Sequence, residues 1–264
     1  MSIDPTASVH PSSVIEAGAK IGAGCHIGPF CLIGPEVTLA EGVELKSHVS
    51  VTGWTDIGAG TVVYPFASLG QVPQDLKFKG ERTRLIIGAN NRIRENVTMN
   101  TGTEGGGGIT RVGDGGLFMA CSHVAHDCQI GNRVILTNSV AIAGHCILED
   151  EVIVGGLSGV HQFVRIGHGA MIGAVTMVTA DVIPHGLVQG PRGLLDGLNL
   201  VGLKRRGADR GDLHALRDLL HDLGTGSFRD SARARADEGS DNKYVREVLD
   251  FILGPSDRSF LAPR

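Results

Sequence analysis

Four histidines crowd into one stretch of the chain, and imidazole is suited to proton transfer. They are His123, His126, His145 and His161, out of eleven histidines in the sequence. An imidazole has a reference pKa of about 6.5, so it can take a proton from a hydroxyl group near neutral pH. We therefore predict that His126 acts as a general base.

Two other interpretations of these histidines stay open. Neutral imidazole is a zinc ligand, so His123, His126 and His145 could bind zinc as in the γ-class carbonic anhydrases, although spacings of 3 and 19 residues are not a specific metal signature. Alternatively, the histidines are inert surface residues of a binding or scaffolding protein. The polar segment 71–84, expected to lie nearby, favours a functional site over this last interpretation.

A six-residue repeat predicts the elements that would position the histidines. An aliphatic residue recurs at every sixth position from Ile3 to Leu69, and an apolar residue does so again from Val112 to Val178. A period of six matches neither a helix nor a strand alone, so each unit must be a short strand with a turn. Hexapeptide repeats are typical of a parallel β-helix. The fold class is therefore predicted to be mainly β, with the large apolar residue and a compact residue two positions before it both pointing inward.

Three hexads would complete one triangular coil of about 18 residues, which allows positions on adjacent coils to be matched. Residues 18 apart should then stack at a separation of about 4.8 Å. Gly144 is expected over His126, and His145 over Asp127. His123, His126 and His145 should consequently share one outer region of the β-helix.

The repeat ends before the C-terminus, and this end divides the chain. We predict a β-helix domain over residues 1–184 and a helical domain over residues 185–264. Apolar residues follow helical spacing near residues 209–223 and 242–253. The helical domain is expected to cover an open end of the β-helix, whose unpaired strand edges would otherwise invite aggregation.

Two insertions interrupt the repeat, near residues 71–84 and 101–111. Insertions in solenoids map to loops that often carry function. The second insertion contains four consecutive glycines, Gly105 to Gly108. By themselves these glycines indicate no more than a mobile loop, because a phosphate-binding loop would need a following helix and usually a Lys-Ser or Lys-Thr pair.

Composition excludes several classes of protein. The formal charge of −4 excludes a globally basic nucleic-acid-binding protein, and no apolar run is long enough for a membrane span. We find no secretory signal and expect a cytoplasmic protein. The five cysteines argue against a disulfide framework because their number is odd. Cys128 and Cys146 should stack on adjacent coils and are expected to remain thiols.

Five sequence blocks resemble the UDP-N-acetylglucosamine 3-O-acyltransferase family of hexapeptide-repeat enzymes, and together they extend over almost the whole chain. The blocks are Gln74-Asp75-Leu76-Lys77, Ser122-His123-Val124-Ala125-His126-Asp127-Cys128, Gly144-His145, Val160-His161-Gln162-Phe163, and Gly197-Leu198-Asn199 leading into Gly202-Leu203-Lys204-Arg205-Arg206-Gly207. The resemblance implies a left-handed winding of the β-helix. It also implies transfer of an (R)-3-hydroxyacyl group from acyl carrier protein to the glucosamine 3-OH of UDP-GlcNAc, the first step of lipid A synthesis, without a metal or cofactor.

The resemblance further assigns roles to individual residues. His126 would be the general base, the Gly144 N–H would stabilise the oxyanion, and Asp127 would orient an imidazole unless strand alternation turns it away from His126. Substrate-binding residues would be Gln74, Asp75, Lys77, His123, His145, His161, Gln162, Asn199 and Arg205, and the acyl-chain pocket would include Ala174 and Arg192.

Assembly and carrier binding also follow from the resemblance. The family forms homotrimers with active sites between subunits, so Arg205 would serve the His126 of a neighbour. The basic cluster Lys204-Arg205-Arg206 would attract the acidic acyl carrier protein.

Several positions depart from the family pattern. Val201 stands where Glu is frequent, and Asn100-Thr101 replace a common His-Arg pair. Ala174 occupies a position that is Gly in enzymes that use long acyl chains. These departures leave the acyl length open, with a preference for a chain shorter than the longest in the family, and an amino analogue of UDP-GlcNAc remains an alternative acceptor.

Overall fold

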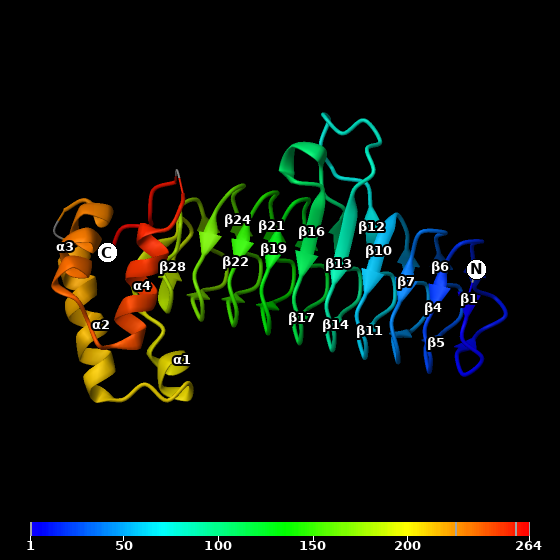
Figure 1. Cartoon of the computed structure of the whole chain (residues 1–264), viewed down its shortest axis with the longest axis horizontal. Coiled ribbons are helices and arrows are strands. Elements are labelled where there is room, and N and C mark those ends of the chain that lie inside the picture. The colour runs from blue at the N-terminus through cyan, green and yellow to red at the C-terminus, as the bar shows by residue number, and fades with distance from the viewer. Residues whose placement is uncertain (1, 225, 257, 264) are drawn as a thin grey trace.

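The chain folds into a left-handed parallel β-helix followed by a group of α-helices (Figure 1). This computed structural model describes residues 2–224, 226–256 and 258–263. The strands form three sheets of 9, 11 and 9 strands, here called sheets A, B and C. The chain passes from A to B to C in each coil, as the sequence repeat predicts.

Each sheet takes one strand from every coil. Sheet A contains β1 (Ser2–Ile3), β4 (Lys20–Ile21), β7 (Thr38–Leu39), β10 (Trp54–Ile57), β13 (Arg84–Ile87), β16 (Ile109–Val112), β19 (Gln129–Ile130), β22 (Ile147–Leu148) and β25 (Arg165–Ile166). Sheet B contains β2 (Ser8–Val9), β5 (His26–Ile27), β8 (Glu44–Leu45), β11 (Val62–Val63), β14 (Arg92–Ile93), β17 (Leu117–Phe118), β20 (Ile135–Leu136), β23 (Ile153–Val154), β26 (Met171–Ile172), β28 (Gly186–Gln189) and β29 (Leu194–Leu198). Sheet C contains β3 (Val14–Ile15), β6 (Leu32–Ile33), β9 (Ser50–Val51), β12 (Ser68–Gln71), β15 (Thr98–Asn100), β18 (His123–Val124), β21 (Ala141–Ile142), β24 (Gly159–Val160) and β27 (Met177–Val178).

The interior is filled by the two inward positions of the hexad. Large aliphatic residues such as Ile27 and Leu45 are fully buried, as are compact residues such as Ala19. The register confirms the predicted stacking, because His123 pairs with Ala141 and so lies 18 residues below it. Ile3 is 38% exposed because it belongs to the first coil, which no other coil covers on that side.

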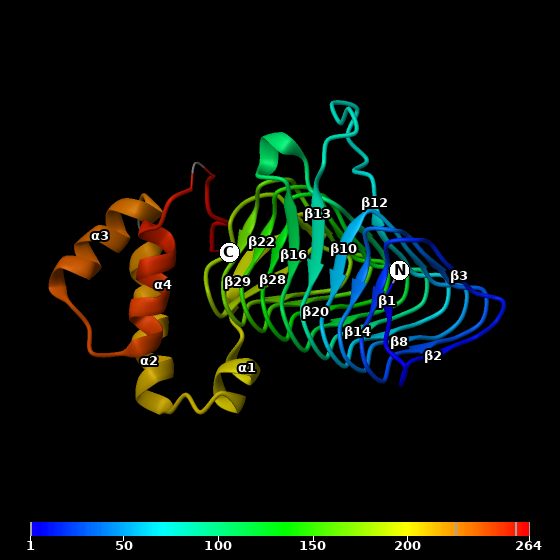
Figure 2. The ribbon, with the colours of Figure 1, turned by 45° about the vertical axis from the view of Figure 1, so that its right-hand side comes forward.

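Both insertions leave the β-helix on the same side (Figure 1 and Figure 2). One connects β12 to β13, and the other connects β15 to β16 and contains a 3-10 helix, η1 (Glu104–Gly106). The insertions contact each other at their bases, where the Thr83 hydroxyl donates to the Thr101 hydroxyl at 3.1 Å. The glycine insertion is therefore attached at its base to the first insertion.

The parallel ladder continues past residue 184. Strand β28 is parallel to β26 and forms an antiparallel pair with β29. A strand hairpin therefore precedes the helices within residues 185–264, a segment for which the sequence indicated only helices. The division into domains at residues 184 and 185 remains a prediction.

Within the described residues, four helices follow the hairpin, at the end of the β-helix opposite the N-terminus (Figure 1). They are α1 (Leu200–Arg205), α2 (Arg210–Leu223), α3 (Phe228–Glu238) and α4 (Lys243–Leu253). Helices α2 and α4 confirm the two helices predicted from the spacing of apolar residues. Helix α3 was not predicted, because Ala232 is its one buried residue and it therefore shows no apolar spacing. No described helix has the length and apolar content that crossing a bilayer requires.

Candidate active site

The candidate catalytic residues lie on one edge of the β-helix. His126 and Asp127 occupy the turn between β18 and β19, and His145 occupies the equivalent turn of the next coil, between β21 and β22. We call this edge, where the chain passes from sheet C to sheet A, the C–A corner. Both insertions leave from the same corner. The predicted stacking of His145 next to Asp127 is present, and the His145 N–H donates to the His126 carbonyl at 3.0 Å.

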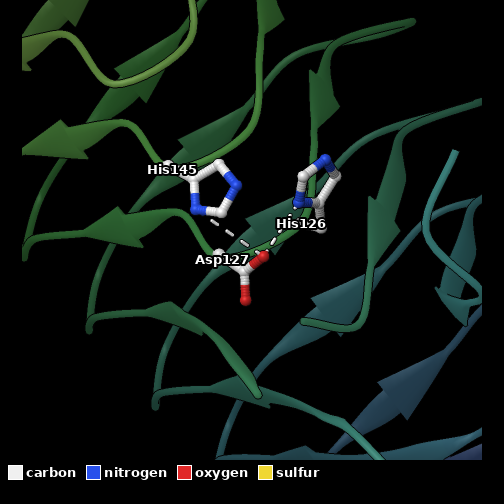
Figure 3. A group of neighbouring side chains, drawn as sticks. All are labelled: His126, Asp127 and His145. Carbon is white, nitrogen blue, oxygen red and sulfur yellow. Dashed lines mark hydrogen bonds and ion pairs between the residues drawn. The ribbon is translucent and has the colours of Figure 1, made fainter. Parts of the chain in front are cut away.

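His126 and Asp127 form a buried pair (Figure 3). The His126 Nδ1 atom lies 2.8 Å from Asp127 Oδ2, and the two side chains are 7% and 1% exposed. Strand alternation does not separate them, because Asp127 has a left-handed backbone with φ of 60° that turns its side chain back toward His126. A carboxylate only accepts, so Nδ1 carries the proton and Nε2 is left as an acceptor.

Gly144 lies against the ring of His126. A Cβ atom placed on Gly144 would come within 2.5 Å of Cε1 and 2.7 Å of Nε2 of that imidazole. A side chain at this position would therefore displace the ring, so the site needs glycine. Among the described residues, no hydrogen bond occupies the Gly144 N–H, which leaves it able to donate to a substrate.

His145 contacts both members of the pair. Its ring meets the His126 ring edge-on at 5.0 Å, and its Nδ1 lies 3.8 Å from Asp127 Oδ2. Its other face stacks on Phe163 at 4.4 Å, a contact that the sequence did not predict. Burial lowers the pKa of His145, although the carboxylates of Asp127 and Asp75 oppose this effect. At a pH above this lowered pKa, His145 is therefore a neutral neighbour of the His126–Asp127 pair.

His123 is oriented differently from His126 and His145. Its Nδ1 lies 2.7 Å from the Thr98 hydroxyl, and burial lowers its pKa. The ligand atoms that converge at this corner belong to His126, Asp127 and His145. The three-histidine set of the zinc interpretation is consequently not the set that comes together, and the carbonic anhydrase interpretation loses its support.

A groove of about 410 Å³ runs from this corner along sheet C. Its floor is a ladder in which Ala141, Gly159 and Met177 pair in successive coils. The small side chain of Ala141 leaves the first part open, and the Met177 side chain extends back over Gly159, where its Cε lies 3.1 Å from a Cβ placed on that glycine. The predicted site residues that line the groove are Gln74, His123, His126, Gly144, His161 and Gln162. Sequence reasoning missed Met177.

Asp75 and Lys77, the other predicted site residues of the first insertion, lie close to His145. The Asp75 carboxylate accepts from the Lys77 N–H at 2.9 Å, which shapes the loop. The charges of Asp75 and Lys77 both act on His145. Leu76, between them, is fully exposed. The loop therefore presents one charge of each sign beside the histidines.

Other predicted residues lie elsewhere in this chain. The Asn199 side chain caps α1 by accepting from the Gly202 N–H at 3.0 Å, and it donates to the Gly169 carbonyl. Figure 1 shows α1 on the opposite side of the molecule from the insertions. Arg205 is exposed on α1. Within one chain, Asn199 and Arg205 therefore do not come together with His126.

The predicted acyl-pocket residues flank the far end of the groove. Ala174 lies in the turn between β26 and β27 and is not among the residues that line the groove. Arg192 forms a parallel bridge with Met177, so its backbone continues the sheet C ladder by one step.

Arg206 departs from the predicted basic cluster because its side chain points inward. Its guanidinium lies 3.0 Å from Nδ1 of His185 and 3.5 Å from a Glu151 carboxylate oxygen. The exposed part of the cluster is Lys204 and Arg205. Any attraction of an acidic partner to this surface would depend on these two residues.

A second group that could hold a metal by distance consists of His168, His185 and Glu247. The Glu247 carboxylate accepts from both imidazoles, from His185 Nε2 at 2.9 Å. Because Arg206 can only donate, Nδ1 of His185 must accept and Nε2 must carry the proton. A metal on Nε2 would require that proton to move to Nδ1, against Arg206. The group is therefore a hydrogen-bond network that joins the β-helix to α4.

Comparisons with known proteins identify related sequences. Residues 181–261 match the family "Udp N-acetylglucosamine O-acyltransferase; Domain 2", and residues 12–47 match "Bacterial transferase hexapeptide (six repeats)". The acyl-[acyl-carrier-protein]–UDP-N-acetylglucosamine O-acyltransferase of Paracoccus denitrificans is 81% identical over 76% of this chain and 77% of its own length. The enzyme of the same name from Rhizobium leguminosarum is 50% identical over 86% of this chain and 84% of its own length.

Solved structures give the same result. A crystal structure of a UDP-N-acetylglucosamine acyltransferase is 42% identical, has a TM-score of 0.90 and covers 100% of both chains. The UDP-N-acetylglucosamine acyltransferase from Campylobacter jejuni is 34% identical with a TM-score of 0.90 and covers 97% of this chain and 100% of its own.

Proposed function

Because this chain belongs to the UDP-N-acetylglucosamine O-acyltransferase family and is an acyltransferase, we propose that it transfers an (R)-3-hydroxyacyl group from acyl carrier protein to the 3-OH of UDP-GlcNAc. The reaction would be the first step of lipid A synthesis and would take place in the cytoplasm. The observation that supports this proposal is His126, which has Nδ1 engaged by Asp127 and Nε2 available beside a groove with an apolar far end.

The proposed reaction is a direct attack without a covalent enzyme intermediate. Nε2 of His126 takes the proton of the sugar 3-OH while that oxygen forms a bond to the thioester carbon, which is worth about 10²- to 10⁴-fold for a positioned base. The negative charge that develops on the carbonyl oxygen is stabilised by the Gly144 N–H. When the C–S bond breaks, the imidazolium returns its proton to the thiolate of the carrier. The product is the 3-O-acyl sugar nucleotide.

In this proposal, each part of the substrates is assigned to a region in or beside the groove. Asp75 and Lys77 would hold the sugar and diphosphate region, with Gln74, His161 and Gln162 nearby. The acyl chain would follow the floor of sheet C over Ala141 toward Gly159, where the Met177 side chain would stop it. Small residues near the reacting centre and a bulky one at the end support an acyl chain of limited length.

A homotrimer would complete the site. Helix α1, which Asn199 caps and which ends at Arg205, lies on the opposite side of the chain from the insertions (Figure 1), so a neighbouring subunit would bring these two residues to the nucleotide. Arg205 offers a planar pair of donors that fits phosphate oxygens. Lys204 and Arg205 would also attract the acidic carrier protein.

Mass spectrometry of the products tests the proposal. Purified protein is incubated with a ladder of (R)-3-hydroxyacyl carrier proteins and with either UDP-GlcNAc or its 3-amino analogue. We expect an acylated UDP-GlcNAc, and fragmentation should place the acyl group on the 3-oxygen. Acylation of the amino analogue alone would replace the proposed acceptor, and no transfer at any acyl length would overturn the proposal.

A further inference from the structure

The glycine insertion packs directly on the Asp127 carboxylate. A Cβ atom placed on Gly106 would come within 2.1 Å of the Asp127 Cγ and within 2.5 Å of both carboxylate oxygens. A Cβ on Gly102 would lie 2.8 Å from Asp127 Oδ1 and 2.4 Å from backbone atoms of Gly108 and Ile109. Side chains at these two positions would collide with the carboxylate, so glycine allows the loop backbone to reach it.

The loop brings Thr103 to both oxygens of that carboxylate. The Thr103 N–H donates to Oδ1 at 2.8 Å, and its hydroxyl donates to Oδ2 at 2.6 Å. Counted over the whole residue, Thr103 is 9% and Asp127 is 5% exposed, so water has little access to compete for these bonds. From below, the Thr110 hydroxyl accepts from the Asp127 N–H at 2.8 Å.

The carboxylate has two imidazoles within reach. Oδ2 lies 2.8 Å from Nδ1 of His126 and 3.8 Å from Nδ1 of His145. A rotation of the carboxylate would bring it closer to His145 and would release the proton on Nδ1 of His126. Because Thr103 occupies Oδ1 and one side of Oδ2, it leaves Oδ2 directed at His126.

We propose that Thr103 is a positioning residue, which holds Asp127 on His126 in preference to His145 and thereby keeps Nε2 of His126 in the unprotonated form that accepts the substrate proton. The inference rests on the proposed acyl transfer for its consequence in turnover. Its structural part, the tautomer of His126, stands independently of the substrate.

Two substitutions of Thr103 separate positioning from packing. Thr103→Val keeps the branched shape and removes the hydroxyl, whereas Thr103→Ser restores the hydroxyl on a smaller side chain. Glu104→Gln, an exposed neighbour in η1, is the control. We expect kcat of the Val variant to fall about 10- to 100-fold, the effect of one hydrogen bond to a charged group, with KM for UDP-GlcNAc and acyl carrier protein unchanged. The Ser and Gln variants should keep wild-type kcat.

Nitrogen NMR of the imidazoles supplies a readout that needs no substrate. In the wild type, His126 should show a protonated Nδ1 and an unprotonated Nε2, and Thr103→Val should show a mixture of tautomers while thermal unfolding stays cooperative. Wild-type kcat in the Val variant, or an unchanged His126 tautomer, would overturn the proposal. Equal losses in the Val and Ser variants would assign Thr103 to packing instead. If the wild type transfers no acyl group, the proposed function fails, and the NMR comparison still decides the role of Thr103.

Discussion

The Nδ1 atom of His126 lies 2.8 Å from a carboxylate oxygen of Asp127, the next residue in the sequence. Neighbouring residues in a strand point to opposite faces, so this contact exists because Asp127 adopts a left-handed backbone in the turn. The pair fixes which nitrogen of His126 carries the proton.

Asp127→Asn tests this relationship. An amide directed at Nδ1 can donate to it, which moves the imidazole proton to Nε2 and removes the base. We expect kcat to fall about 10²- to 10⁴-fold, as for other carboxylate partners of a catalytic histidine, with little change in KM. Steady-state kinetics and far-UV circular dichroism on the same sample are the measurements. An unchanged kcat in a folded variant would contradict the assigned tautomer.

Gly144→Ala tests the space that the ring requires. The added methyl group would lie 2.5 Å from Cε1 of His126, so the imidazole must move out of line. We expect kcat to fall at least about 10-fold, because small displacements of a catalytic group are costly. Gly156→Ala is the matched control, since Gly156 also precedes a left-handed residue in a turn and has no atom closer than 3.3 Å to an added Cβ. Equal kinetics for the two variants would remove Gly144 from the site.

Met177→Ala tests the far end of the groove. Successive positions of the ladder are about 4.8 Å apart, so removal of this side chain should open the groove by roughly one coil. In the ladder of hydroxyacyl carrier proteins, the preferred acyl chain should become longer, while kcat for short chains stays the same. Val175→Ala, which is exposed on the neighbouring turn and does not line the groove, should keep the wild-type preference. An unchanged preference in Met177→Ala would place the acyl chain elsewhere.

Glu247→Gln tests the network between the β-helix and α4. Although burial opposes the effect, hydrogen bonds from His168 and His185 lower the pKa of Glu247 to about 2. A carboxyl group with a lowered pKa stabilises the fold above its unfolded value and loses this contribution as pH falls toward 2. The part of the Tm difference that comes from this carboxylate should therefore shrink as pH falls below about 4.5.

The two histidines of this network act in opposite directions. Hydrogen bonding to Glu247 raises the pKa of His168, so its contribution is lost as pH rises above that value. Burial lowers the pKa of His185, so its contribution is lost as pH falls below about 6.5. Calorimetry over this range, with the exposed Glu41→Gln as control, is the measurement. A Tm difference between wild type and Glu247→Gln that does not vary with pH would reject the network as the source of pH dependence.

The six-residue repeat was enough to predict most of the fold and the arrangement of residues at the centre of the candidate site. Strand registers in a β-helix are set by inward side chains, so simple counting placed Gly144 next to His126 and His145 next to Asp127. A different pattern, the helical spacing of apolar residues, predicted α2 and α4, each of which buries one face.

Residues outside the register could not be placed in this way. Thr103 lies in an insertion that does not follow the 18-residue register, so its contact with Asp127 could not be predicted by counting. Nothing in the sequence indicated which residue the neighbouring glycines contact. Arg206 belonged to a basic run, and its inward direction depends on His185 and Glu151 from distant parts of the chain. Met177 occupies an ordinary outward position of its hexad, so nothing in the repeat distinguished it as a site residue.

The role of His126 as general base is decided by the turnover of His126→Ala with UDP-GlcNAc and an (R)-3-hydroxyacyl carrier protein of the preferred length. We expect kcat to fall about 10²- to 10⁴-fold, the contribution of a positioned general base, while KM and the folded state are preserved. His123→Ala, which lines the same groove without a carboxylate partner among the described contacts, should lose much less. Turnover of His126→Ala close to that of the wild type would show that His126 is not the base.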